Sequence, residues 1–146
     1  MTAIGSQGTM QLATEAVEAF STGDWERLRT ALAPDAVWEQ VCTEDRFEGP
    51  DAVIELNRAW KQAFSDARGT VTKALCTEDT AVLEATYQGT HDGDLQTPRG
   101  AIPPSGRKAT VRSVLVVRVA DGRITEVRQY FDLLTILGQI GAAPPA

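Results

Sequence analysis

The stretch that decides the fold is residues 109–132, ATVRSVLVVRVADGRITEVRQYFD. Apolar and polar side chains alternate on both sides of Asp121-Gly122, a dipeptide that favours a tight hairpin turn. This pattern predicts two adjacent strands, Ala109 to Ala120 and Arg123 to Phe131, followed by a short apolar helix from Leu133 to Ile140. Alternate side chains of such strands point into the interior, so we seek the function there.

The residues before this hairpin divide into a helical part and a strand part. Helical spacing of apolar residues predicts three helices: from Leu12 to Phe20, after a cap at Asp24, and after Gly49-Pro50-Asp51. From Gly69 onward apolar residues recur at every second position, the period of a strand. The strands predicted besides the final two are Ala36 to Val41, Thr70 to Cys76 and Ala81 to Thr90. Helices followed by a mostly antiparallel sheet are typical of an α+β fold.

Length and composition indicate one domain. The chain has 146 residues, enough for one core, and no repeat or linker divides it, so we expect a single domain over residues 1–146. Residues 1–8 are small and polar and residues 142–146 are rich in Ala and Pro, and we expect both segments to be flexible. Residues 1–8 also lack the basic and apolar regions of a signal peptide, so we expect a cytoplasmic protein.

Charge and cysteine content exclude several classes of partner. The formal net charge of -6 argues against binding to a nucleic-acid backbone or an anionic membrane surface. The two cysteines, Cys42 and Cys76, lack the spacing of metal ligands, and we expect no metal site.

Between Leu12 and Gly141 the chain carries short segments that are weakly specific singly and fairly specific together. They are Ser21-Thr22-Gly23-Asp24, Leu32-Ala33-Pro34-Asp35-Ala36, Phe47-Glu48-Gly49-Pro50, Gly89-Thr90-His91, Pro103-Pro104-Ser105-Gly106-Arg107, Asp121-Gly122-Arg123-Ile124, and Tyr130-Phe131-Asp132 with Leu137, Gln139, Ile140 and Gly141. In these segments the chain resembles the SnoaL-like polyketide cyclases, within the superfamily of NTF2-like and ketosteroid-isomerase-like domains. The resemblance implies a cone of helices on a curved sheet around a deep apolar pocket, a homodimer, and cofactor-free chemistry on a small organic molecule.

The sequence departs from the catalytic residues of that superfamily. Its aldol cyclases carry an Asp on the last strand and a His on the strand before it, and counting from Asp121-Gly122 gives Gln129 and Leu115 at these positions. Ketosteroid isomerases carry a carboxylate base on the first strand and an oxyanion-binding Tyr on the first helix, where this chain has Gln40 and Ala16. Neither catalytic set is carried over.

Strand alternation predicts which side chains share the pocket with these positions. An amide such as that of Gln129 cannot act as a base at neutral pH, but it can donate a hydrogen bond to a developing oxyanion. The pocket is therefore expected to be mostly apolar and suited to orienting a carbonyl compound. The predicted substrate-binding residues are Trp38, Gln40, Trp60, Tyr87, Ser113, Leu115, Val117 and Phe131.

The candidate catalytic residues are His91, Gln129 and Asp132. The ordinary pKa of a histidine, about 6.5, suits proton transfer near neutral pH, and His91 is the only histidine. The alternative for His91 is a structural role at a strand end, beside the turn signal Asp92-Gly93. Asp132 directly precedes the last helix, so we expect it to act mainly as an N-cap and not as a catalytic acid.

Two further features concern the surface. The sheet face turned away from the pocket carries Val114, Val116, Arg128 and Tyr130, a mixture of apolar and charged side chains that suits a homodimer interface. The segment from Gly93 to Gly106 is rich in Gly and Pro, and we predict an irregular flap over the mouth of the pocket.

Three functions remain open from the sequence. The leading one is a cofactor-independent enzyme of specialised metabolism that performs cyclisation or a related proton transfer on a polyketide-like substrate, with His91 as the proton shuttle. The second is a hydratase, dehydratase or epoxide-opening enzyme, which needs a carboxylate to activate water. The third is an NTF2-like protein that binds a ligand without catalysis.

Overall fold

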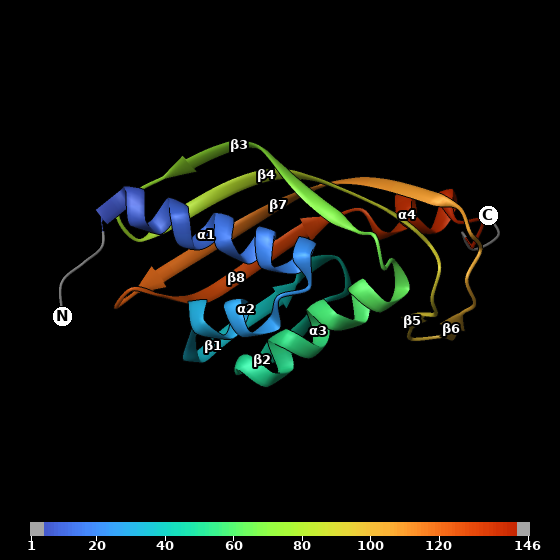
Figure 1. The fold of residues 1–146 in the computed structure, drawn as a ribbon, viewed down its shortest axis with the longest axis horizontal. Coiled ribbons are helices and arrows are strands. Elements are labelled where there is room, and N and C mark those ends of the chain that lie inside the picture. Colours follow the sequence, from blue (N-terminus) through green and yellow to red (C-terminus); the bar gives the residue numbers. More distant parts are fainter. Residues whose placement is uncertain (1–4, 143–146) are drawn as a thin grey trace.

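In the computed structural model, which describes residues 5–142, helices cover one face of a six-stranded sheet (Figure 1). The first half contains α1 (Gly5–Thr22), α2 (Trp25–Ala31), β1 (Leu32–Gln40), the 3-10 turn η1 (Val41–Thr43), β2 (Asp45–Glu48) and α3 (Pro50–Ala63). The second half contains β3 (Arg68–Cys76), β4 (Thr80–Thr90), β5 (Leu95–Thr97), β6 (Gly100–Ile102), β7 (Lys108–Ala120), β8 (Arg123–Phe131) and α4 (Leu133–Gln139). Together these elements form an α+β cone of helices on a curved sheet, as the resemblance implies.

The predicted final hairpin forms the middle of the sheet, whose strand order is β2-β1-β8-β7-β4-β3. Neighbouring strands pair antiparallel except β1 and β8, which run parallel. Between β7 and β8, Asp121 and Gly122 have φ angles of 54° and 73°. Positive φ at both positions is what a two-residue type I′ turn requires, so the turn chemistry read from the sequence is confirmed.

Helices α2, α3 and α4 each start where the sequence signals for a helix N-terminus predict. The Asp24 carboxylate accepts a hydrogen bond from the backbone N–H of Arg27 at 3.1 Å, and Pro50 is the first residue of α3. The Asp132 carboxylate accepts one from the N–H of Leu134 at 3.0 Å, as expected of the N-cap of α4. Residues 5–8, which composition indicated as flexible, form the first turns of α1, whereas residues 1–4 and 143–146 lie outside the described range.

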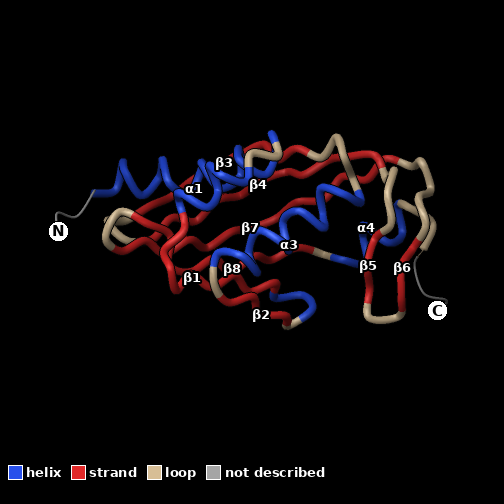
Figure 2. The backbone as a smooth tube through the Cα atoms, turned by 60° about the horizontal axis from the view of Figure 1, so that its bottom comes forward, coloured by secondary structure: helices blue, strands red, loops and turns tan. Residues whose placement is uncertain are grey.

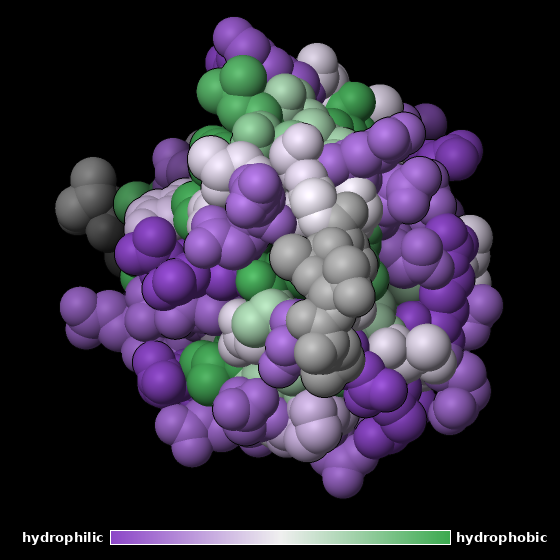
Figure 3. Space-filling view, turned by 90° about the vertical axis from the view of Figure 1, so that its left-hand side faces the viewer, coloured by the Kyte–Doolittle hydropathy of each residue, from purple (hydrophilic) through white to green (hydrophobic). Residues whose placement is uncertain are grey.

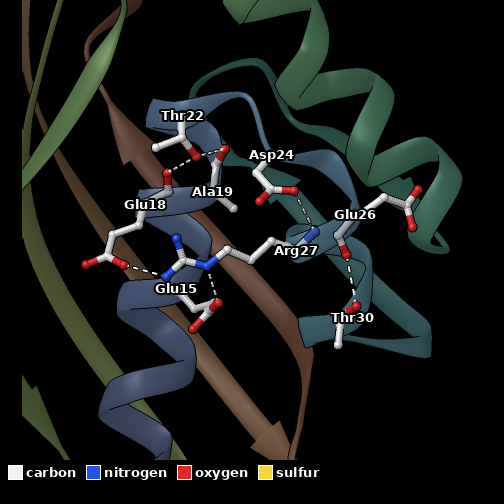
Figure 4. A network of polar contacts seen from close by, with 8 residues as sticks. All are labelled: Glu15, Glu18, Ala19, Thr22, Asp24, Glu26, Arg27 and Thr30. Atoms are coloured by element: carbon white, nitrogen blue, oxygen red, sulfur yellow. Dashed lines mark hydrogen bonds and ion pairs between the residues drawn. The ribbon is translucent and has the colours of Figure 1, made fainter.

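One charged network fixes α2 against α1 (Figure 4). The Arg27 guanidinium forms ion pairs with Glu15 and, at 2.6 Å, with Glu18, both on α1. The hydrogen bonds that Arg27 donates to these carboxylates, the one to Glu15 first, raise the pKa of Arg27. The network lies at the surface, so it orients the two helices more than it stabilises the fold.

Strands β1, β2, β5 and β6 differ from the sequence prediction. Strand β1 begins at Leu32 and not at Ala36, because the pairing with β8 shifts register between Leu32 and Val37 and so accommodates Pro34, which cannot donate a ladder hydrogen bond. Strand β2 was not predicted. The Gly/Pro-rich segment after His91 is also not wholly irregular, since β5 and β6 pair there as a small hairpin.

The interior has two apolar clusters. The larger one lies between α1, α2, α3 and the sheet, and the smaller one joins the end of α3 to α4 and the β5–β6 hairpin, at the end of the molecule away from α1's start (Figures 1 and 2). The surface, seen from the end where the chain begins, is mostly hydrophilic, with hydrophobic side chains in small groups (Figure 3).

Among residues 5–142, no helix is long and apolar enough to cross a membrane.

Candidate functional site

An apolar cavity of about 80 Å³ lies on the helix-covered face of the sheet, with walls from α1, α3, α4 and the strands β1, β4, β7 and β8. This volume has room for only a few water molecules, so a larger ligand must displace side chains or extend through the opening. No charged residue lines it. The aromatic residues of its wall are Phe20, Trp38, Trp60, Phe64, Tyr87 and Phe131, and the other polar ones are Asn57, Gln88, Ser113 and Gln129.

The aromatic rings hold one another in fixed orientations. Trp60 of α3 meets Phe131 of β8 edge to face, with ring centroids 5.7 Å apart, and lies 6.4 Å from Phe64. On the opposite wall, Phe20 and Tyr87 also meet edge to face at 5.7 Å. Such pairs add packing energy to burial, so they stabilise the ring orientations of the cavity wall.

The amide of Gln129 is held in one orientation by two neighbours. The Trp38 indole N–H donates to Oε1 of Gln129 at 3.2 Å, and Nε2 of Gln129 donates to the Ser113 hydroxyl at 3.3 Å. Because an indole can only donate, Oε1 must face Trp38 and the NH₂ group must face Ser113. The three residues come from β1, β8 and β7, which lie side by side in the sheet.

Gln40 repeats this arrangement one strand away. It pairs with Gln129 across the parallel β1–β8 ladder, its Oε1 accepts from the Trp60 indole at 3.0 Å, and its Nε2 donates to Thr43 at 3.0 Å. Gln40 is buried but does not line the cavity. Two indole-bound amides therefore stand side by side where the superfamily carries catalytic carboxylates.

The cavity brings together six of the predicted site residues and leaves out three on the same sheet face. Trp38, Trp60, Tyr87, Ser113, Gln129 and Phe131 all line it. Leu115 and Val117 are fully buried in the larger apolar cluster and do not line the cavity. Gln40 is the third residue that does not line it. The strand face was therefore predicted correctly, while the depth along each strand was not.

His91 is completely buried and does not line the cavity; its ring lies against Phe64, with centroids 5.3 Å apart. Its Nδ1 accepts the backbone N–H of Ser105 at 3.1 Å, so in the neutral ring the proton is on Nε2. Nε2 has no hydrogen-bond partner among the described residues. The structure thus does not place His91 on the cavity wall, where a proton shuttle would have to reach the ligand.

Neither Asp132 nor the predicted flap reaches the cavity. Asp132 is exposed and caps α4, and no residue of the segment 93–106 lines the cavity wall. Leu95 of the β5–β6 hairpin is instead buried in the smaller apolar cluster. The segment therefore closes the end of the molecule beside the cavity.

Sequence reasoning missed Asn57, which a clear signal marks. Asn57 is a polar residue on the apolar side of α3, between Ile54 and Trp60. It is buried, and its Nδ2 donates to the Val53 carbonyl at 2.8 Å, so its Oδ1 is the atom free to accept. A polar side chain within an apolar helical stripe is the pattern that could have identified it.

Tyr87 is the ionisable group of the cavity wall. Burial raises the pKa of its phenol, so the hydroxyl remains protonated and is a donor, not a base. Within residues 5–142, no group of three His, Cys, Asp or Glu side chains is arranged to hold a metal ion. The described site can bind, orient and donate hydrogen bonds, but its wall carries no carboxylate or imidazole.

Solved structures share this architecture over nearly the whole chain. A proposed SnoaL-like polyketide cyclase from Jannaschia sp. CCS1 is 22% identical, with a TM-score of 0.83 over 99% of both chains. IdmH from Streptomyces antibioticus, a proposed polyketide cyclase, is 28% identical, with a TM-score of 0.77 over 91% of this chain and 98% of that one. A LEH-like epoxide hydrolase of M. tuberculosis is 19% identical, with a TM-score of 0.71 over 92% of this chain and 90% of that one.

No curated protein sequence matches the chain. The family model described as SnoaL-like polyketide cyclase matches residues 10–140, the range that contains every wall of the cavity and both amides. The helices, sheet and cavity position of the structure also agree with the expected cone. The chain belongs to the SnoaL-like polyketide cyclase family.

Proposed function

We propose that this protein binds a neutral, largely apolar carbonyl compound of the polyketide type and promotes its cyclisation, or a related proton transfer, without a cofactor. The observation that carries this function is the uncharged aromatic cavity, in which a fixed amide donor, Gln129, stands where the aldol cyclases of the family carry an acid. A wall without charges favours a neutral ligand, since a buried unpaired charge on the ligand would be costly.

Rate acceleration would come mainly from positioning. A flexible polyketone held with its reacting carbons in contact avoids the entropy cost of finding that geometry in water, which is worth up to about 7–11 kcal/mol in favourable cases. When a base from solvent removes the α-proton of the bound ketone, the Gln129 N–H can stabilise the negative charge that develops on the carbonyl oxygen of the enolate. Removal of one such donor typically costs about 10²-fold to 10³-fold in kcat. His91 is not assigned the proton shuttle, because its ring packs off the cavity wall.

A second candidate function is ligand binding without catalysis. The observation that favours it is the lack of any carboxylate or imidazole among the residues that line the cavity. The same observation disfavours hydration, dehydration or epoxide opening, which need an activated water. The M. tuberculosis epoxide hydrolase shares the fold with this chain, and that likeness carries no reaction with it.

Binding and turnover of synthetic triketide and tetraketide methyl esters test these alternatives. Quenching of Trp38 and Trp60 fluorescence reports binding, and liquid chromatography with mass detection compares products with and without protein. We expect binding together with an altered cyclisation rate or product ratio. Binding with unchanged products would support the second candidate, and no binding would reject both.

A matched pair of variants locates the effect. Val111→Phe adds a ring to the cavity wall, and Val37→Phe adds the same ring to β1 beside Trp38 but on the opposite face of the sheet. We expect Val111→Phe to weaken ester binding by about tenfold or more, since overfilled sites lose 1–3 kcal/mol. Val37→Phe should leave binding unchanged.

A further inference from the structure

The hydrogen bonds around Gln129 leave two donors without acceptors on the cavity wall. Nε2 of Gln129 carries two hydrogens, one of which is given to Ser113 at 3.3 Å. The second has no acceptor among the described residues, and Gln129 lines the cavity. One amide N–H is therefore available to a ligand.

The Ser113 hydroxyl also has a hydrogen that no described residue accepts. It accepts the Gln129 amide proton, is buried with 4% of its surface exposed, lines the cavity, and donates to no described protein atom. Since a hydroxyl that accepts one hydrogen bond can still donate its own proton, its O–H is the second free donor. A buried donor without a partner costs free energy, which a ligand acceptor can recover.

Trp38 determines the polarity of this pair. If the Gln129 amide were rotated by 180°, its NH₂ group would face the indole N–H, and two donors would oppose each other. Trp38 is buried, with 3% of its surface exposed, so opposing its indole N–H with a second donor would cost free energy. The indole thus keeps the amide NH₂ turned toward Ser113.

Resting on the function proposed above, we propose that Ser113 and Gln129 together bind one acceptor oxygen of the ligand, a ketone or enolate oxygen, and that Trp38 is the positioning residue of this pair. Ser113 becomes a specificity-determining residue, because two hydrogen-bond donors at one point favour a carbonyl oxygen over an oxygen-free carbon at the same place. Donors 3.3 Å apart can both reach a single oxygen when the hydrogen bond between Gln129 and Ser113 bends toward it, since the two N–H bonds of the amide point about 120° apart.

Three probes of nearly equal shape test this oxygen site: acetophenone carrying ¹³C at the carbonyl, 1-phenylethanol and ethylbenzene. NMR titration gives the dissociation constant of each, and the ¹³C shift of bound acetophenone reports hydrogen bonding to its oxygen directly. In the wild-type protein we expect acetophenone to bind about threefold to tenfold more tightly than ethylbenzene beyond their difference in hydrophobicity, with the carbonyl resonance moved downfield.

The variants separate the oxygen site from the cavity. Ser113→Ala should lower the acetophenone-to-ethylbenzene preference by about threefold to tenfold and return part of the carbonyl shift, with ethylbenzene affinity kept within about twofold. Trp38→Phe should lower the same preference, since the amide is then free to turn. The control is Thr43→Ala, which removes a hydroxyl that also accepts a Gln amide proton but does not line the cavity. If Ser113→Ala does not fold, Ser113→Cys keeps the shape of the side chain with a slightly larger atom, weakens the donor and is read in the same way.

Two failures are distinguishable. Binding of all three probes with no preference for the ketone, or a preference that survives Ser113→Ala, would overturn the oxygen site and leave the proposed function standing. Absence of binding of every probe to the wild-type protein would overturn the proposed function and the oxygen site with it.

Discussion

At the scale of single residues, Gln129 shows how one atom sets the chemistry of the site. The amide keeps the hydrogen bond from Trp38 and stays uncharged inside an aromatic wall. Gln129→Glu keeps the size and the acceptor oxygen, but it introduces an acid whose charged form is disfavoured by burial. The pKa of the new carboxyl should therefore be raised above its value in the unfolded chain.

This shift predicts the sign of a stability change. A carboxyl with a raised pKa in the folded state does not lower the free energy of unfolding while it is protonated. It destabilises the fold as pH rises above the unfolded pKa of about 4.3. We expect the melting temperature of Gln129→Glu, relative to wild type, to fall between pH 4.5 and pH 8, by the equivalent of about 1–3 kcal/mol. Gln11→Glu, on the exposed side of α1, should show no such trend. A flat difference for both variants would mean that position 129 is solvated.

Individual side chains also show where sequence reasoning succeeds and stops. Alternation from Gln129 and Leu115 assigned the correct sheet face to all the predicted strand residues of the site. It could not distinguish Ser113, at the cavity, from Val117, in the core, because parity fixes the face of a residue and not which helix covers it. His91 likewise shares the parity of Tyr87, but Phe64 from the end of α3 packs against it, a contact without a local signal.

At the scale of elements, α4 depends on its first residue. Asp132 accepts hydrogen bonds from the N–H groups of Leu134 and Thr135, and Ile136 of the same helix lines the cavity. Asp132→Ala should cost about 1 kcal/mol of unfolding free energy, and Asp132→Asn nearly nothing, because Asn caps almost as well. Urea titration measures both. Equal stability of wild type and Asp132→Ala would show that packing alone holds α4.

A second junction joins the end of α3 to the end of β4. The Asp66 carboxylate accepts from the backbone N–H and the hydroxyl of Thr90, at 2.6 and 2.8 Å, and the Asp92 carboxylate accepts from the backbone N–H of Ser65 at 2.9 Å. These bonds lower the pKa of both carboxyls: the backbone N–H of Thr90 is the main cause for Asp66, and the Ser65 hydroxyl for Asp92.

A lowered pKa gives stability that is present above the unfolded value and is lost as pH falls through the folded one. Asp66→Ala should therefore cost about 1 kcal/mol at neutral pH, an amount reduced by solvent exposure, and less near pH 3. Thermal unfolding at both pH values measures this, with Asp94→Ala on the exposed neighbouring loop as the control. A cost that does not change with pH would assign the effect to shape and not to charge.

Elements bounded by capping or turn residues were predictable from the sequence, and elements without such residues were not. Asp24, Pro50, Asp121-Gly122 and Asp132 each mark a boundary that the structure keeps. The short β5–β6 hairpin has three residues in each strand and stands among Gly and Pro, so its pairing depends on Leu95 entering the smaller cluster. That is tertiary information, which local pattern does not contain.

At the scale of the whole molecule, the sheet face turned away from the helices exposes apolar side chains. Leu75, Val82 and Val116 lie in register across β3, β4 and β7, and Leu75 is 63% exposed. Tyr130, 40% exposed, pairs with Val114 in the next row, and together these side chains form an apolar patch on the face predicted to form a homodimer. We expect a dimer mass by light scattering at micromolar concentration and a monomer for Val116→Glu. Leu134→Glu, on exposed α4, should remain dimeric. A monomeric wild-type protein would remove this interface.

The parallel pairing of β1 with β8 has a consequence for synthesis of the chain. Strand β8, near the end of the sequence, lies between β1 and β7, so the sheet stays divided until residues 123–131 are available. A growing chain can pair β3, β4 and β7 with one another, but β1 and β2 have no neighbour on that side until β8 leaves the ribosome. Because contacts between distant segments form slowly, we expect this closure to limit the folding rate. A chain that ends at residue 122 should lack the near-ultraviolet circular dichroism of packed tryptophans, and release of the full chain should restore it.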